Sequence, residues 1–204
     1  IEPGTVIHGE TSSKGALVIT RGSQIIADGT KDKPIVFTSD AANPKRGDWG
    51  GVVVCGNAPT NASFNGVQGV GQVEGGVNNG EGLGLFGGTN AADNSGILRY
   101  VRIEYAGYAY LPDNELNGLT LAGVGNATTV DYVEIFKATM LSSASVVLLT
   151  CAILSSSAHW MTISILIMVT AVLYNSESLF AILQLPISLN LKAGKATTMP
   201  TVVH

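Results

Sequence analysis

Tyr100-Val101-Arg102-Ile103 returns further along the chain as Tyr132-Val133-Glu134-Ile135, and this repetition decides the fold. A second pair shows the same likeness, since Gly15-Ala16-Leu17-Val18-Ile19 resembles Gly50-Gly51-Val52-Val53-Val54. Short segments that recur along one chain are typical of solenoids, in which each repeat packs on the one before it. The repeats therefore predict a stack of similar coils.

The remainder of residues 1–137 has the pattern of short strands joined by turns. No helical period competes, and the breaks carry Gly, Asn, Asp and Pro, as at Arg21-Gly22, Asp28-Gly29 and Pro112-Asp113-Asn114. We therefore predict an all-β fold, a parallel β-solenoid, with a β-sandwich or barrel as the alternative. The predicted strands are Leu17–Thr20, Gln24–Ala27, Ile35–Thr38, Val52–Cys55, Ile97–Tyr105, Leu119–Leu121 and Val130–Phe136.

Alternation within the repeated pair predicts which side chains are buried. In a parallel solenoid each strand pairs with strands of the neighbouring coils, and every second side chain points into the core. Arg102 and Glu134 would face outward at equivalent positions and lie near each other, which tests the register. As an exposed pair they would contribute at most about 1 kcal/mol. The residues predicted to point inward are Val101, Ile103, Val133 and Ile135.

Several stretches of residues 1–137 resemble, in order, a family of bacterial secreted or cell-surface right-handed β-helix proteins. The likeness is carried by Ile1-Glu2-Pro3-Gly4-Thr5-Val6-Ile7, Ala27-Asp28-Gly29-Thr30, Lys33-Pro34-Ile35-Val36-Phe37-Thr38-Ser39, Arg46-Gly47-Asp48-Trp49-Gly50-Gly51, Tyr100–Gly107, Asn117–Leu121 and Val130–Glu134. Members of that family are exported as lipoproteins or carry a C-terminal sorting domain, and most have no assigned activity. The resemblance thus implies a right-handed parallel β-helix fragment at the outer cell surface or outside the cell.

The composition changes abruptly near residue 137, which suggests two segments, 1–137 and 138–204. Gly194 is the only glycine after that point, although the chain has 25, and Glu177 is the only acidic residue there, out of 15. All four methionines follow residue 137. We expect β-helix coils in 1–137 and an irregular or poorly packed apolar tail in 138–204.

The tail fits a shifted reading frame. A one-base slip forms each codon from the last base of one printed codon and the first two of the next. Trp160-Met161 then forces an Asp codon, Met161-Thr162 another, and Met168-Val169 a Gly codon. Residues 162–170 permit the reading Asp-Asp-Phe-Asp-Ile-Asp-Asn-Gly-Tyr, which resembles the acidic, aromatic stretch that the family carries there. We therefore predict that residues from about Ala138 onward are frameshifted.

A membrane-spanning tail is the competing interpretation. The run from Ala138 to Ser176 has no Asp, Glu, Lys or Arg and exceeds the roughly 20 residues that one spanning helix needs. Against it, the run lacks flanking basic anchors and has only Trp160 and Tyr174 as aromatic residues for the interfaces. The sequence favours membrane contact only through a lipid anchor outside this chain, where an export signal would also lie.

Charge and metal-binding residue types exclude several functions. The net charge of −4 and pI of about 5.3, without a cluster of Lys or Arg, argue against nucleic acid as a partner. Cys55 and Cys151 form no CxxC pair, and His8, His159 and His204 are isolated from one another. The sequence identifies no catalytic, cofactor-binding or metal-binding residue and predicts no cofactor.

Some polar and aromatic residues are nevertheless candidates for chemistry. Carboxylates and arginines could form a surface of the kind that β-helix enzymes use on acidic polysaccharides, although ordinary coil surface is the simpler interpretation. Aromatic rings could stack on sugars, although core packing is the commoner use. The charged candidates are Asp113, Glu115, Asp131, Glu134, Arg99 and Arg102, and the aromatic candidates are Trp49, Phe64, Phe86, Tyr105, Tyr108 and Tyr110.

Two motifs are interpreted as structural. Arg46-Gly47-Asp48 has the letters of a cell-adhesion tripeptide but fits a turn into the next strand. The glycines of residues 66–88 lack a phosphate-loop pattern and predict a long surface loop.

The function that the sequence favours is non-enzymatic. We expect an exported surface or extracellular β-helix scaffold whose partners are glycans or other cell-surface macromolecules. A lyase-like β-helix enzyme acting on polysaccharides and a membrane-anchored protein with a β-rich ectodomain stay open as alternatives.

Overall fold

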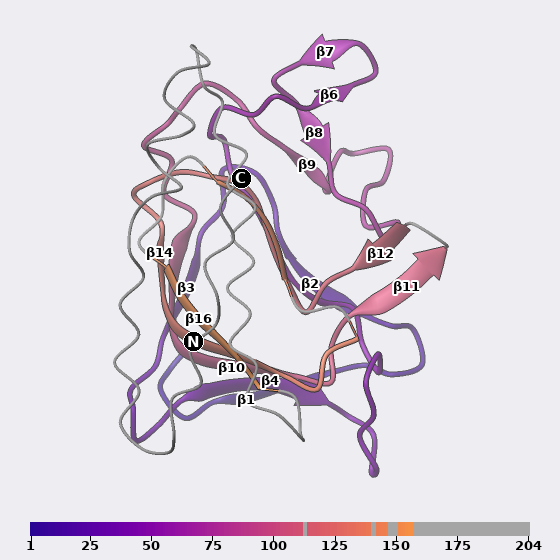
Figure 1. Cartoon of the computed structure of the whole chain (residues 1–204), viewed down its shortest axis with the longest axis vertical. Helices are drawn as coiled ribbons and strands as arrows, with labels where there is room; N and C mark the ends of the chain where they lie inside the picture. Colours follow the sequence, from indigo (N-terminus) through magenta and orange to yellow (C-terminus); the bar gives the residue numbers. More distant parts are fainter. Residues whose placement is uncertain (112–113, 140–141, 147–150, 157–204) are drawn as a thin grey trace, which may run out of the picture. The chain divides into compact units, whose positions relative to one another are not determined.

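The computed structural model describes residues 1–111, 114–139, 142–146 and 151–156, all within one unit, Ile1–Val172. The described residues contain strands and no helix (Figure 1). All predicted strands form; six of them lie within one residue of the expected bounds, and the predicted Leu119–Leu121 is longer in the structure, as Leu119–Val124. The pattern missed β1 (Val6–Gly9), whose sequence Val-Ile-His-Gly has too few apolar residues to stand out.

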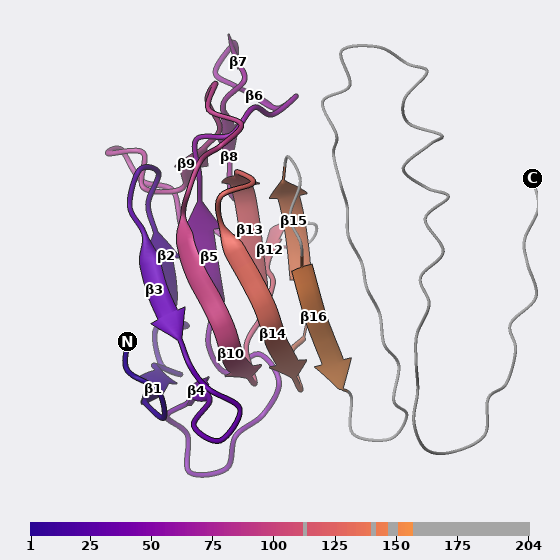
Figure 2. The ribbon, with the colours of Figure 1, turned by 90° about the vertical axis from the view of Figure 1, so that its left-hand side faces the viewer.

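The first sheet stacks strands from successive coils in parallel. Its members are β1, β3 (Ile25–Asp28), β4 (Ile35–Ser39), β10 (Gly96–Glu104), β14 (Thr129–Phe136) and β16 (Cys151–Ser156). Figure 2 shows β3, β10, β14 and β16 side by side and pointing the same way. Val101 pairs with Val133, Arg102 with Glu134 and Ile103 with Ile135, so the predicted register is confirmed.

The second sheet is also parallel and runs back across the core. It contains β2 (Ala16–Ile19), β5 (Gly51–Cys55), β13 (Leu119–Val124) and β15 (Ser142–Val146). Leu17 pairs with Val52, as the second repeat predicts. In Figure 2 the strands β5, β13 and β15 lie behind the first sheet and point the opposite way. Parallel pairing between strands far apart in sequence excludes the sandwich or barrel and confirms the β-helix.

A left-handed residue bends each long strand of the first sheet. Tyr100 in β10 has φ 48 and Tyr132 in β14 has φ 51, although tyrosine rarely adopts this conformation. On one side of the bend, residues 96–99 of β10 pair with β3, and on the other side residues 101–103 pair with β4. The bend therefore lets a single strand, β10, continue both β3 and β4 in the stack.

The core lies between the two sheets. The repeated residues Val101, Ile103, Val133 and Ile135 are buried, as predicted, and they pack with Leu119 and Leu121 of the second sheet. β-branched and leucine side chains fill the interior of successive coils at the same height, so the core continues from coil to coil.

An insertion and a hairpin cover the outer face of the second sheet. Residues 56–95 separate β5 from β10 and contain two short antiparallel pairs, β6 (Ser63–Phe64) with β7 (Val67–Gln68) and β8 (Gly71–Gln72) with β9 (Leu85–Phe86). The hairpin of β11 (Tyr108–Leu111) and β12 (Asn114–Leu116) lies on the same face, where Leu116 belongs to one apolar cluster with residues of β5 and of the insertion.

The prediction that residues 66–88 form a surface loop is therefore incomplete. Val73 and Phe86 of the insertion pack with Val53 and Cys55 of β5, which explains why every residue of β5 is buried. The insertion carries enough apolar side chains to fold over the sheet.

The Arg46-Gly47-Asp48 segment is a structural turn, as predicted. Asp48 is buried, and its carboxylate accepts hydrogen bonds from the Ser39 hydroxyl at 2.7 Å and the Lys45 backbone N–H at 2.8 Å. A buried Asp used in this way is unavailable to a receptor.

The predicted tail, 138–204, falls outside the described residues except for 138–139, β15 and β16. The described part of the chain holds no apolar helix of membrane-spanning length.

Candidate functional site

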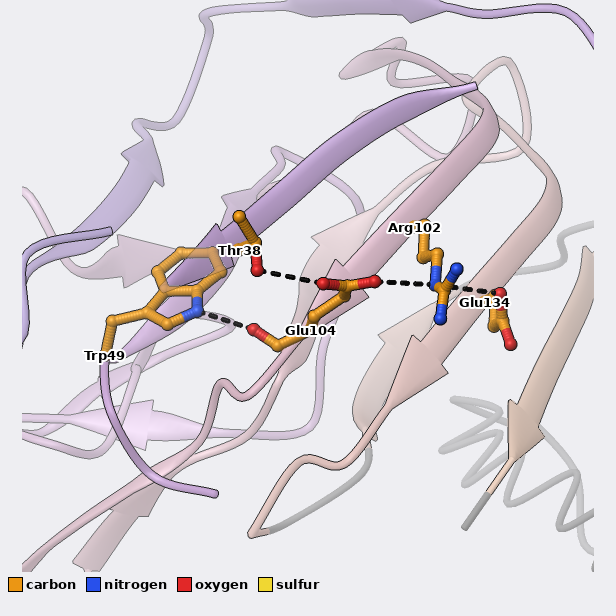
Figure 3. A network of polar contacts seen from close by, with 5 residues as sticks. All are labelled: Thr38, Trp49, Arg102, Glu104 and Glu134. Carbon is orange, nitrogen blue, oxygen red and sulfur yellow. Dashed lines mark hydrogen bonds and ion pairs between the residues drawn. The ribbon is translucent and has the colours of Figure 1, made fainter. Parts of the chain in front are cut away.

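A row of polar side chains crosses the outer face of β4, β10 and β14 (Figure 3). The Thr38 hydroxyl donates to Glu104 at 2.9 Å, Arg102 Nε lies 2.8 Å from Glu104 Oε1, and the same nitrogen lies 3.2 Å from Glu134 Oε2. The predicted meeting of Arg102 and Glu134 is therefore confirmed. Strand pairing places Arg102 beside Glu134 and Glu104 next to Thr38, and the two outward positions of β10, Arg102 and Glu104, link the pairs into one row.

Two carboxylates neutralise Arg102, and a ring covers it. Its guanidinium carbon lies 4.8 Å from the centre of the Phe136 ring, a cation–π distance. The Nε–H is buried and aligned with neither carboxylate as a hydrogen bond, so these contacts are ion pairs. With about a third of the arginine side chain exposed, each pair contributes at most about 1 kcal/mol.

Trp49 is buried beneath this row and holds the backbone of one of its members, Glu104, in place. The indole is 2% exposed and its Nε1–H donates to the backbone oxygen of Glu104 at 2.8 Å (Figure 3). Core packing, not sugar stacking, is therefore the role of this aromatic candidate.

Arg99, which lies before the bend in the part of β10 that pairs with β3, also forms an ion pair. Arg99 contacts the Asp28 carboxylate at 2.9 Å, and Asp131 occupies the matching position on β14. Glu115, by contrast, lies on β12, and Asp113 lies outside the described residues. The structure thus divides the predicted charged candidates between different surfaces.

Two tyrosines at the bends form an aromatic stack in which Tyr100 is half-buried and Tyr132 is exposed. The rings of Tyr100 and Tyr132 lie 4.6 Å apart at an angle of 3°, and Tyr132 is 51% exposed. Arg99 and Arg102 flank Tyr100 in sequence and also face outward, because the left-handed residue interrupts the alternation. The aromatic candidates taken from the sequence omitted both tyrosines. The signal was present, since they begin the repeated stretch.

The other aromatic candidates are scattered. Tyr105 meets Phe136 edge to face, with Lys137 above both rings, and Tyr108 lies under Lys14. Tyr110 is 52% exposed on β11, and no described aromatic ring stacks on it.

A pocket of about 160 Å³ opens on the covered face of the second sheet. The insertion, β12 and β13 surround it, so its walls come from three parts of the chain. The side chains and backbone that line it belong to Gln72, Val73, Glu74, Phe86, Glu115, Asn117, Thr120, Leu121 and Ala122.

Metal and nucleophile chemistry finds little support in the described residues. Among them, no three His, Cys, Asp or Glu side chains gather as metal ligands. Burial raises the pKa of the Cys55 thiol to about 11, so this cysteine is protonated at neutral pH and is a poor nucleophile.

The protein is a parallel β-helix, as shown by its stacked parallel strands, the strand bends at residues with positive φ, and a core that continues from coil to coil. The model of the family described as pectate-lyase-like β-helix domains matches residues 1–140, and the chain belongs to this family. Neither a curated protein nor a solved structure matches it. Because a fold hosts many activities, the ligand has to be argued from this chain's own residues.

Proposed function

We propose that this chain is the β-helix part of an exported scaffold protein that binds a glycan on the face around Tyr100 and Tyr132. The observation that carries the proposal is the stack of these two parallel rings, of which Tyr132 is exposed. A tyrosine face offers the flat apolar surface on which the C–H face of a sugar ring packs, and the hydroxyls and flanking charged groups offer hydrogen bonds. Membership of a pectate-lyase-like family supports a polysaccharide as the partner.

A scaffold is favoured over a lyase because both arginines of this face are ion-paired. A lyase needs a basic group that takes up a proton in the reaction. Arg99 faces Asp28, Arg102 faces Glu104 and Glu134, and a guanidinium holds its proton throughout the physiological range. The polysaccharide-modifying alternative is tested by the same experiment.

The experiment measures retardation of the purified full chain in gels containing polygalacturonate, xylan or β-glucan. We expect at least one polysaccharide to retard the wild type and Tyr132→Asn to weaken the effect about fivefold, since an aromatic contact contributes about 1 kcal/mol. Asparagine tolerates the left-handed backbone at this position. The matched control is Tyr110→Asn, which removes an equally exposed tyrosine and should leave binding unchanged.

Retention of full binding by Tyr132→Asn, or no retardation of the wild type by any of the three, would contradict the proposal. Shortened or unsaturated polysaccharide products after incubation would favour the enzyme instead.

The export route is a further part of the proposal. The resemblance of residues 1–137 to bacterial lipoprotein or sorting-domain β-helix proteins supports a location outside the cell, with any lipid anchor beyond this chain. Protease treatment of intact source cells tests it: digestion of the protein supports surface exposure, and full protection contradicts it.

The frameshift of residues from about Ala138 onward is proposed on the codons that Trp160-Met161, Met161-Thr162 and Met168-Val169 impose. Resequencing the gene across the codon for Lys137 should reveal an inserted or lost base relative to homologous genes. An unbroken frame there would refute the frameshift.

A further inference from the structure

Charged side chains flank the Tyr100–Tyr132 stack on both sides along the strands. One pair immediately precedes the two tyrosines, and a second pair follows them by two positions. A strand rises about 3.3 Å per residue, so both pairs lie within about 7 Å of the tyrosines along the backbone. A sugar packed on the exposed ring of Tyr132 is therefore within the Debye length of about 8 Å that applies at physiological salt. The flanking residues are Arg99 and Arg102 on β10 and Asp131 and Glu134 on β14.

Carboxylates outnumber cations in the row that precedes the tyrosines. Strand pairing puts Asp28 of β3, Arg99 of β10 and Asp131 of β14 at one height on three neighbouring strands. Arg99 is already ion-paired, since its guanidinium lies 2.9 Å from the Asp28 carboxylate. Two carboxylates and one guanidinium leave this row with one negative charge in excess.

The row that follows the tyrosines has the same balance. Arg102 Nε lies 2.8 Å from Glu104 Oε1 and 3.2 Å from Glu134 Oε2 (Figure 3). Two carboxylates and one guanidinium again leave one negative charge in excess. Neither Arg99 nor Arg102 is available to an acidic sugar unless an ion pair within the protein is broken first.

The nearest further cations do not change this balance. Lys33, just before β4, packs on Gly4 in the segment that leads into β1, and β1 lies on the opposite side of β4 from β10. Lys31 and Asp32 of the same turn cancel each other in charge. Lys137, just beyond the end of β14, lies above two aromatic rings. Among the described residues, no three Asp, Glu, His or Cys side chains gather to hold a cation that could bridge a uronate to these carboxylates.

We propose that the tyrosine face selects an uncharged polysaccharide and discriminates against polymers of uronic acids. The proposal rests on the proposed glycan-binding function and adds the class of sugar to it. Four carboxylates and two arginines leave this face with two negative charges in excess, which repel a uronate. In water, a charge about 8 Å from another changes an affinity about twofold, so two excess charges weaken each bound uronate about fivefold. An uncharged sugar ring meets no such repulsion and still packs on Tyr132.

The test compares polygalacturonate with its methyl ester, because the two polymers share a backbone and differ in the charge of the carboxyl groups. Gel retardation of the purified full chain is measured with each polymer, with β-glucan as a second uncharged polymer, at low and at high salt. We expect an uncharged polymer to retard the chain most and polygalacturonate to bind at least about fivefold more weakly. The difference should shrink at high salt, since salt screens the repulsion.

Two double variants locate the effect. Asp131→Asn/Glu134→Gln removes one carboxylate from each row, keeps an amide in its place and leaves Arg102 paired with Glu104. This variant should raise the binding of polygalacturonate about fivefold relative to that of β-glucan. The matched control, Glu74→Gln/Glu81→Gln, removes the same total charge from exposed positions of the insertion and should leave that ratio unchanged.

Polygalacturonate that retards the wild type as strongly as the uncharged polymers, with or without added Ca²⁺, would overturn the proposal. An unchanged ratio in Asp131→Asn/Glu134→Gln, or an equal rise in the insertion control, would overturn it as well. The proposed function survives these results if Tyr132→Asn still weakens the retardation that is observed. Retardation by none of the polymers would overturn the proposed function together with this inference.

Discussion

Replacing Thr120 by valine should stabilise the protein, although the residue lies in the middle of a buried strand. The substitution exchanges a hydroxyl for a methyl of nearly the same size. Leaving a buried polar group without a partner costs about 1–3 kcal/mol, and a buried methyl group contributes about 0.8 kcal/mol. Thr120 is 8% exposed and its hydroxyl has no partner among the described residues. The two effects act in the same direction, so we expect the free energy of unfolding to rise by about 2–4 kcal/mol.

Thr128 supplies a control of opposite sign. It is also buried, but its hydroxyl accepts the backbone N–H of Ser95 at 2.9 Å and lies 3.4 Å from the Asp93 backbone oxygen. Thr128→Val leaves the Ser95 N–H, in a residue 1% exposed, without its acceptor. The same chemical change should therefore destabilise the protein by about 1–3 kcal/mol.

The assay is urea denaturation of both variants and the wild type, compared by midpoint at unchanged slope. A midpoint raised for Thr120→Val and lowered for Thr128→Val supports the hydrogen-bond assignments. If Thr120→Val destabilises the protein as much as Thr128→Val does, the Thr120 hydroxyl has a partner in the folded chain.

Three further outcomes are expected. Gly96→Ala should destabilise the fold by about 3 kcal/mol or more in the same urea assay, because Gly96 has φ 112 and a Cβ would strike the Ile25 backbone oxygen. The control Gly80→Ala places its Cβ in open space and should change the free energy of unfolding by no more than about 0.5 kcal/mol. Equal effects of the two substitutions would refute the contact. Cys55 should resist a thiol reagent at pH 8 until the chain is unfolded, since burial raises its pKa to about 11. Rapid labelling at Cys55 itself in the native protein, located apart from Cys151 by peptide mapping, would contradict this. The pKa of Asp40 is lowered by hydrogen bonds from the Thr11 hydroxyl and backbone N–H, so the stabilising contribution of Asp40 is present above about pH 4 and is lost as the pH falls through the lowered pKa. Thr11→Val should raise the pKa of Asp40 toward its ordinary value in an NMR titration. An unchanged titration would refute the assignment.

The repeat by itself predicts the register of the first sheet. Alternation placed Val101 and Ile103 inside and Arg102 outside, and equivalence of the two copies placed Arg102 beside Glu134. These predictions succeed because the side-chain period of a strand is a local property, and because a parallel stack repeats the same height on every coil. The turn at Arg46-Gly47-Asp48 followed from its neighbours in the same way.

The bends at Tyr100 and Tyr132 were not predictable from local sequence. Nothing in a tyrosine signals a left-handed backbone, and the residues on either side read as one continuous strand. The stacking of the coils imposes the bend, and the bend in turn brings the two rings together in the open. The aromatic stack therefore depends on tertiary structure, although Tyr100 and Tyr132 are the first residues of the two repeated stretches.

The sequence by itself determined the all-β solenoid and the inward and outward positions of its strands. Only the tertiary structure decided that residues 56–95 fold back over the second sheet, and that Glu74, Glu115 and Thr120 line one pocket there. The physical reason is that the alternation of inward and outward side chains is a local property of each strand. The meeting of an insertion, a hairpin and a strand depends instead on apolar burial between segments far apart in the chain.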